Sequence, residues 1–258
     1  MDLKKKYHSL SNYLSVFSTP VDALKFRKLR KNLMKETISP ISIRVRGAGN
    51  RALLCRPNTS DHGVLWDTFY QKYHVPPCNL REDAIIVDLG ANVGYTMVHL
   101  AHLYPKAHVY GVEMDIENFK IAKQNIASFM DRCSIIHSAV WSENGEISYG
   151  GEETNAFSIV NNTKDENKKN RIPAKTLDMI FKEFGLSRVD YLKMDIEGAE
   201  KFVLQHPENW IQNVKSMKIE IHKPANIDDC MMILEKHGFQ CKKDNHHPSC
   251  IIAIRNSN

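Results

Sequence analysis

The stretch Ala84-Ile-Ile-Val-Asp88-Leu-Gly90-Ala-Asn92-Val-Gly94-Tyr95-Thr96 decides the fold of this chain. An apolar run of mostly β-branched residues ends at an acid, and two glycines bracket the turn that follows. The next segment, 97–103, carries apolar residues at helical spacing. A strand, a glycine-containing turn and a helix N-terminus form a cradle in which free backbone N–H groups face a ligand.

Two residues distinguish the ligands that such a cradle binds. Asn92 stands where a dinucleotide fingerprint requires its middle glycine, so a pyrophosphate site is not expected. Asp88 is a poor neighbour for a phosphate but a good partner for an ammonium group, such as the amino-acid end of S-adenosylmethionine. A second apolar strand, 109–112, ends at Glu113, about twenty residues after Gly94, the spacing at which an acid binds a ribose diol.

Composition describes an ordinary globular protein. Of 258 residues, 42% are hydrophobic and 25% are charged, which is enough to bury a sizeable core. The chain has neither an uninterrupted apolar run long enough to span a membrane nor the apolar core of a signal peptide at its start. Six cysteines are scattered without a Cys-x-x-Cys pair, which argues for a reducing cytoplasm and against structural zinc or disulfides.

The net charge of +5 is concentrated in a basic leader, residues 1–35. The rest of the chain, residues 36–258, is slightly acidic, and this disfavours nucleic acid as a partner. The leader has three interpretations: peripheral contact with an anionic inner membrane face, attraction of an acidic glycan, or the solvated surface of a helix.

Periodicity divides the chain near residue 80. Before it we expect an extension, 1–80, that covers the cofactor or acceptor; after it we expect a cofactor-binding domain, 81–258. Within the extension, the spacing predicts helix over 1–35 with a break at Pro20, a hairpin over 41–56 and a short helix from Val64.

Strands and helices then alternate, which predicts an α/β fold with a doubly wound, Rossmann-like parallel sheet. A last pair of strands joined by a short turn must add an antiparallel strand, as in the methyltransferase version of this sheet. Two local details are also expected: a small hairpin around Asn144-Gly145, and a mobile polar loop over 150–170. The predicted strands are 134–137, 139–141, 146–149, 171–175, 189–194, 217–221, 239–242 and 250–254, and the predicted helices are 116–129, 177–184, 199–205 and 228–237.

A second polar cluster follows two strands that this sheet order makes neighbours. Asp195 and Glu197 lie at the end of one strand at period two, and Glu220 and His222 lie at the end of the next. If the extended conformation persists, each pair shares a side. Ligands bind beyond these strand ends, so the four side chains are expected to be catalytic. Glu200 is interpreted as a cap of the following helix.

Several motifs resemble the FkbM family of methyltransferases over roughly residues 43–222. They are Arg56-Pro-Asn-Thr-Ser-Asp61, Val87-Asp-Leu-Gly-Ala-Asn-Val-Gly-Tyr-Thr96, Gly111-Val-Glu-Met-Asp115 and Tyr191-Leu-Lys-Met-Asp-Ile-Glu-Gly-Ala-Glu200. The resemblance implies an S-adenosylmethionine-dependent O-methyltransferase of the Rossmann-like class. It assigns cofactor binding to Asp88, Gly90, Asn92, Gly94 and Glu113, and the grip on adenine to Ser138 and Ala139.

The leading hypothesis for function is methylation of a hydroxyl on a glycan or glycolipid. One alternative is another small-molecule hydroxyl of the polyketide kind. RNA is less favoured, because Lys-Met-Asp-Ile-Glu stands where base-methylating enzymes usually carry an Asn/Asp-Pro-Pro-aromatic signature. A cofactor-binding module without activity is disfavoured by the intact polar cluster.

Two mechanisms for removing the acceptor's proton stay open at this point. In one, His222 is a general base oriented by Glu220 or Asp195. In the other, the same four side chains, Asp195, Glu197, Glu220 and His222, hold Mg²⁺, which lowers the pKa of the hydroxyl. Lys193 shares the side of Asp195 and supplies positive charge there, so the metal-free base is preferred.

Overall fold

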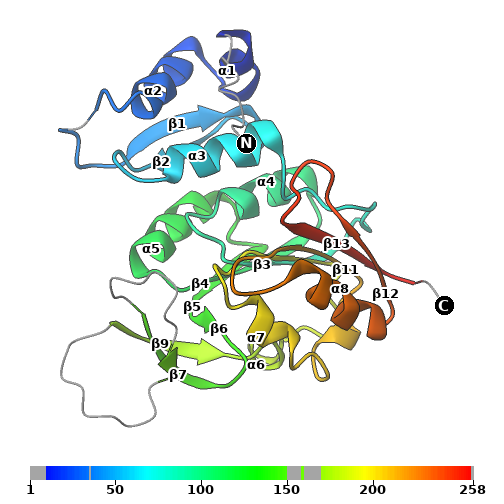
Figure 1. Ribbon diagram of the computed structural model, residues 1–258. Coiled ribbons are helices and arrows are strands. Elements are labelled where there is room, and N and C mark those ends of the chain that lie inside the picture. The colour runs from blue at the N-terminus through cyan, green and yellow to red at the C-terminus, as the bar shows by residue number, and fades with distance from the viewer. Residues whose placement is uncertain (1–9, 35, 150–157, 160–169, 257–258) are drawn as a thin grey trace.

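The computed structural model describes residues 10–34, 36–149, 158–159 and 170–256 (Figure 1). Its centre is a seven-stranded sheet in the order β12-β13-β11-β10-β3-β4-β5. These strands are β3 (Ile85–Leu89), β4 (His108–Glu113), β5 (Cys133–His137), β10 (Tyr191–Met194), β11 (Ser216–Glu220), β12 (Phe239–Lys243) and β13 (Cys250–Arg255).

Strand β13 runs antiparallel to both of its neighbours, β11 and β12, whereas β5, β4, β3, β10 and β11 pair in parallel. The predicted fold, a Rossmann-like parallel sheet with an antiparallel final strand, is therefore confirmed. The final strand does not lie at the edge. It inserts between β11 and β12, so that β12 forms the edge.

Helices cover both faces of the sheet (Figure 1). Strand β3 shows how the alternation works: Ile86 packs into the cluster on the side of α4, and Val87 packs into the cluster that holds α6 and α8. Both residues are fully buried. The helices are α4 (Tyr95–Leu103) and α5 (Ile116–Asn125) on one face, and α6 (Leu177–Glu183), α7 (Glu200–Leu204) and α8 (Ile227–Lys236) on the other.

The N-terminal extension lies against the outer side of α4 and α5 (Figure 1). Thr19 caps its second helix, and Pro20 is the first residue of that helix, a position where proline is favoured. The predicted break at Pro20 is confirmed, because the first helix ends at Val16 and the second begins at this proline. The elements are α1 (Leu10–Val16), α2 (Pro20–Arg30), β1 (Ile41–Val45), β2 (Arg51–Cys55), α3 (Asp61–Trp66) and a π-helical turn (Asp67–Gln71).

The extension and the sheet share one continuous hydrophobic cluster. Phe17, Phe26 and Trp66 of the extension belong to the same buried cluster as Met97 and Leu100 of α4. The predicted boundary near residue 80 stays a prediction, because no separate core marks it. Within the described residues, no helix is long and apolar enough to cross a membrane. Membrane contact by the basic leader also stays a prediction, and residues 1–9 lie outside the described residues.

The hairpin predicted around Asn144-Gly145 is wrong. Strand β9 (Asn170–Lys175) lies between β6 (Ala139–Val140) and β7 (Gly145–Tyr149), in a four-stranded sheet completed by β8 (Ser158–Ile159). Ala174 pairs with Ala139 on one side and with Gly145 on the other. A strand distant in sequence thus occupies the position that the hairpin interpretation gave to an adjacent one. Most of the predicted loop over 150–170 lies outside the described residues.

A buried pair of histidines joins the extension to α4. His99 Nδ1 lies 2.9 Å from His74 Nε2, so one ring donates a hydrogen bond to the other. Burial lowers the pKa of His99 from 6.5 to about 4 and lowers the pKa of His74 well below its ordinary value. Both rings are therefore neutral in the folded protein.

Acidification is expected to destabilise the protein through this pair. Below pH 6.5 the unfolded chain takes up protons, whereas folded His99 stays neutral down to a pH of about 4. His99 alone should lower the free energy of unfolding by ~3 kcal/mol between those two pH values, and it should add no pH dependence above them. Urea unfolding at pH 7 and 4.5 measures the difference. This difference in unfolding free energy should shrink in His99→Gln. It should persist in His108→Gln, a change at an exposed histidine. An equal difference in the wild type and both variants would contradict the assignment.

Candidate active site

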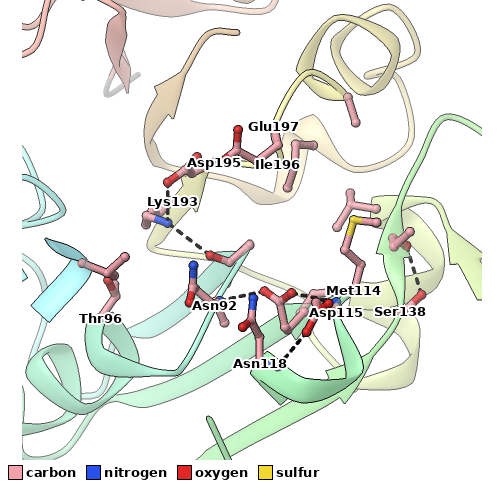
Figure 2. A pocket seen from close by; sticks show the side chains of 18 of the residues that line it. Asn92, Thr96, Met114, Asp115, Asn118, Ser138, Lys193, Asp195, Ile196 and Glu197 are labelled. Atoms are coloured by element: carbon pink, nitrogen blue, oxygen red, sulfur yellow. Dashed lines mark hydrogen bonds and ion pairs between the residues drawn. The ribbon is translucent and has the colours of Figure 1, made fainter. Parts of the chain in front are cut away.

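A cavity of about 450 Å³ opens at the carboxyl ends of β3, β4 and β10 (Figure 2). This volume lies within the range of small-molecule sites. The extension and the small sheet supply parts of the wall. Its lining includes Ser60, Val64, Tyr73, Gly90, Asn92, Glu113, Met114, Asp115, Asn118, Ser138, Ala139, Val140, Ile147, Lys193, Asp195 and Glu197.

The turn after β3 passes very close to the end of β10. Gly90 has φ +76°, and a Cβ at this position would lie 1.8 Å from the carbonyl oxygen of Asp195. Only glycine fits there. Asn92 (φ +50°) and Gly94 (φ +79°) are also left-handed, and α4 begins directly after Gly94. The turn therefore brings bare backbone to the cavity wall.

Glu113, the last residue of β4, braces this turn. Its carboxylate accepts hydrogen bonds from the backbone N–H groups of Asn92 (2.7 Å) and Asp115 (2.8 Å). The side chain is buried at the cavity wall, and burial raises the pKa of its carboxyl group. Glu113 thus holds the cradle in shape at the cavity wall, and its predicted contact with a ribose stays a prediction.

Replacing Glu113 by alanine is expected to weaken S-adenosylmethionine binding by ~1.5–3 kcal/mol, the range for hydrogen bonds to a charged group. Isothermal titration calorimetry measures the loss. The matched control is Glu117→Ala, which removes an exposed carboxylate that pairs with Lys120 on α5. Unchanged affinity in a folded Glu113 variant would contradict the assignment.

Ser138 and Ala139 line the cavity on its β5 side. The Ser138 hydroxyl donates a hydrogen bond to the carbonyl oxygen of Pro173 (2.9 Å), and its backbone N–H donates to the carbonyl oxygen of Glu113 (3.1 Å). These bonds fix the segment between β4 and the small sheet. Ala139 and Val140 then present an apolar wall of the kind that suits a flat ring, so the predicted grip on adenine stays a prediction with a compatible surface.

Lys193 stands between Asp88 and the cavity. Its Nζ lies 3.2 Å from Asp88 Oδ1 and 3.5 Å from Asp195 Oδ2. Burial acts to lower the pKa of Lys193, but the carboxylates, chiefly Asp88, raise it well above its ordinary value, so this lysine is charged. Sequence reasoning assigned Asp88 to the ammonium of a ligand. In the structure, the ammonium that faces Asp88 belongs to Lys193, and Asp88 itself is fully buried.

The predicted polar cluster does converge, around the ring of His222. Its Nε2 lies 3.7 Å from Glu220 Oε1, 3.7 Å from Glu197 Oε2 and 3.9 Å from Asp195 Oδ1. Of these residues, Asp195 and Glu197 also line the cavity. Asp195 therefore belongs both to the cluster and to the cavity wall.

The route by which Glu197 reaches the cluster differs from the prediction. Strand β10 ends at Met194, and Glu197 has φ +53°, so the period-two pattern does not continue beyond the strand. Its side chain is 79% exposed, against 22% for Asp195. Glu197 is thus a solvated neighbour of His222, and Asp195 is the better-enclosed carboxylate.

Glu200 orients His222, a role that sequence reasoning missed. Its buried carboxylate accepts hydrogen bonds from the backbone N–H groups of Ile196 (3.0 Å) and Gly198 (2.9 Å), just before α7. It also lies 3.0 Å from His222 Nδ1. This hydrogen bond to Glu200 is the main reason that the pKa of His222 rises to about 9. His222 is therefore an imidazolium at neutral pH.

An arginine clamp fixes the part of the wall that the extension supplies. Arg56 donates two hydrogen bonds to the Asp61 carboxylate, through Nε at 3.0 Å and through a terminal nitrogen at 2.8 Å. It also donates to Asn118 Oδ1 on α5 (2.6 Å). The clamp ties the Arg56–Asp61 segment, and with it Ser60, to the same helix whose start adjoins the cradle.

Comparison with known proteins agrees with this geometry. The model of a family described as "Methyltransferase FkbM domain" matches residues 88–241, more than half of the chain. The chain belongs to the FkbM methyltransferase family. It is thus a methyltransferase of the S-adenosylmethionine type, as the resemblance implied.

Relatives of this FkbM methyltransferase are distant. Methyltransferase sdnD of Sordaria araneosa is 24% identical over 201 residues, which cover 64% of this chain and 77% of the relative. Hexuronic acid methyltransferase AglP of Haloferax volcanii is 24% identical over 179 residues, covering 68% and 72%. Among solved structures, M. capricolum TrmK in complex with S-adenosyl-homocysteine has a TM-score of 0.45 at 14% identity, covering 73% of this chain and 67% of that one.

Proposed function

We propose that this FkbM methyltransferase transfers the methyl group of S-adenosylmethionine to a hydroxyl of a sugar. The observation that carries the proposal is the position of Asp195, which lines the cavity and is held between Lys193 and His222. A carboxylate there accepts a hydrogen bond from an acceptor hydroxyl. The name of the relative AglP, a hexuronic acid methyltransferase, supports the sugar class.

When bound, S-adenosylmethionine supplies an electrophilic methyl sulfonium. The protein's part is to hold the acceptor oxygen in line and to take its proton. His222 is a poor candidate for that base, because the Glu200 hydrogen bond raises its pKa to about 9. We therefore assign to Asp195 the role of the base that takes the proton of the acceptor hydroxyl. The ammonium of Lys193 and the imidazolium of His222 orient this carboxylate and stabilise negative charge on the acceptor oxygen.

The donor set also suits a divalent cation, so a metal-assisted mechanism needs its own test. Asp195, Glu220 and His222 each offer one ligand atom, all within 4.8 Å of one another. Two cations of the protein, Lys193 at 3.5 Å from Asp195 and the imidazolium itself, already balance these carboxylates. We propose a metal-free mechanism. Turnover should survive EDTA treatment and removal of the chelator; loss of activity that added Mg²⁺ restores would overturn it.

The acceptor class is tested with methyl-labelled S-adenosylmethionine and four substrate pools: uronic-acid oligosaccharides, neutral oligosaccharides, polyketide phenols and RNA. Label is expected in an oligosaccharide pool, on oxygen, and its rate of incorporation should fall sharply when Asp195→Asn replaces the wild-type enzyme. Label in the polyketide pool or in RNA would overturn the sugar assignment. Residues 36–258 carry 26 Lys and Arg against 28 Asp and Glu, which is unfavourable for binding a phosphate backbone.

A further inference from the structure

A second group of metal-ligating side chains lies beside the His222 cluster, at the junction of β11 and β13. Its first two members are brought together by strand register. Glu220 pairs directly with Cys250 in the antiparallel ladder, and residues that pair directly project to the same side of a sheet. A carboxylate and a thiol are thereby placed next to each other by the backbone itself.

The third member comes from the turn that leads into β13. The Cys250 backbone N–H donates to the carbonyl oxygen of His247 (2.8 Å), which closes a turn over His247-Pro-Ser-Cys250. The turn brings His247 Nδ1 to 3.2 Å from Cys250 Sγ. His247 Nε2 lies 3.7 Å from Glu220 Oε1. One ligand atom from each of the three residues lies within 4.8 Å of the others.

The loop that carries His247 is held in place at both ends. Asp244 forms a largely buried ion pair with Lys218 of β11 (2.5 Å), and its backbone N–H donates to the carbonyl oxygen of Cys250 (2.8 Å). At the other end, the Ile221 N–H donates to the carbonyl oxygen of Ser249 (2.9 Å). The three ligands therefore sit on a preorganised frame, so little conformational entropy opposes binding.

We propose that Glu220, His247 and Cys250 bind one divalent transition-metal ion of the zinc class. A thiolate, an imidazole and a carboxylate are ligands that Zn²⁺ accepts in tetrahedral geometry, with a fourth position left for water. Sulfur disfavours Mg²⁺ and Ca²⁺, which take oxygen ligands. The expectation of no zinc rested on the lack of Cys-x-x-Cys pairs. His247-x-x-Cys250 has that spacing with histidine at one end, and its third ligand comes from strand pairing, not from sequence proximity.

This site meets the proposed catalytic cluster at Glu220 alone. Glu220 Oε1 is 3.7 Å from both His222 Nε2 and His247 Nε2. A bound metal would draw this carboxylate toward His247 and Cys250 and away from His222. Binding itself is measurable without substrate, so the proposal and the proposed function can fail separately.

The test is a titration of the EDTA-stripped full chain with Co²⁺, followed by competition with Zn²⁺. One Co²⁺ per chain should give tetrahedral ligand-field bands and a thiolate-to-cobalt charge-transfer band, and Zn²⁺ should abolish both. Cys250→Ser should remove the charge-transfer band. His247→Ala, at a half-exposed side chain, should weaken binding at least ~10-fold, since even the loss of an outer-shell partner costs 10–100-fold.

The matched control is Cys241→Ser, a half-buried cysteine of β12 outside the group. It should keep the band and the affinity. Circular dichroism establishes that each variant is folded, and His247→Ala carries the test if Cys250→Ser is not. The proposal is overturned if millimolar Co²⁺ gives no charge-transfer band, if the band persists in Cys250→Ser, or if folded His247→Ala binds as tightly as wild type.

Discussion

Replacing Asp195 by asparagine is expected to lower the rate of methyl transfer by roughly 10²–10⁴-fold, the usual contribution of a general base. Asparagine keeps the shape of the side chain and can still contact the acceptor, but it cannot take its proton. S-adenosylmethionine affinity should change little. Single-turnover rates with saturating cofactor measure the effect, and calorimetry checks cofactor binding in the same preparation.

Glu197→Gln is the matched control for this prediction. Both carboxylates lie near His222 Nε2, at 3.9 Å for Asp195 and 3.7 Å for Glu197, but Glu197 is largely exposed. Its loss should cost less than about tenfold, because water screens an exposed charge. Equal rate losses in the two variants would mean that the cluster acts only through its total charge. An active Asp195→Asn enzyme would rule out Asp195 as the base.

Replacing Gly90 by alanine is expected to destabilise the protein by more than ~3 kcal/mol and to abolish measurable cofactor binding. The added Cβ would lie 1.8 Å from the Asp195 carbonyl oxygen, and the clash is with backbone, which no rotamer can relieve. The left-handed φ of +76° adds roughly 1–2 kcal/mol of strain. Urea unfolding and calorimetric titration measure the two losses.

Gly185→Ala separates these two causes. Gly185 has nearly the same φ, +68°, but a Cβ added there would meet no heavy atom within 4 Å beyond its chain neighbours. Only the strain should remain there, so the cost should be about 1–2 kcal/mol with normal cofactor binding. If Gly90→Ala were no more destabilised than Gly185→Ala, the close approach of the turn to β10 would be incorrect.

The architecture of the sheet was predictable because each signal was local. Residues 84–96 contain the strand, turn and helix start in a single run, and Glu113 follows at the expected interval. The pairing of the last two strands also follows from the short connection between them. The small sheet was not predictable in the same way. Strand β9, which lies between β6 and β7, comes some thirty residues after β6, and its Ala174 pairs on both sides.

The residues that make up the candidate site could be predicted from the sequence, but the side chains that contact them could not. Asp195 follows β10, and Glu220 and His222 lie at the end of the neighbouring strand β11, so their convergence follows from topology. The contact of Glu200 with His222 depends on a left-handed residue at Glu197 and on how α7 begins. The contact of Lys193 with Asp88 depends on the register of the neighbouring strands β10 and β3. Such contacts change a residue's charge state, and here they move the assignment of the base from His222 to Asp195.

The hydrophobic cluster shared by the extension and α4 determines where this enzyme can be truncated to make a stable recombinant fragment. The family match starts at residue 88, whereas the cluster already includes Tyr13, and Tyr95 donates a hydrogen bond to the carbonyl oxygen of Leu54 (2.6 Å). A fragment trimmed to the matched region would leave the outer face of α4 bare, and such surfaces drive aggregation. The region that matches the family and the region that shares the buried cluster therefore have different boundaries. Recombinant fragments and chimeric enzymes should be divided at the boundary of the region that shares the buried cluster.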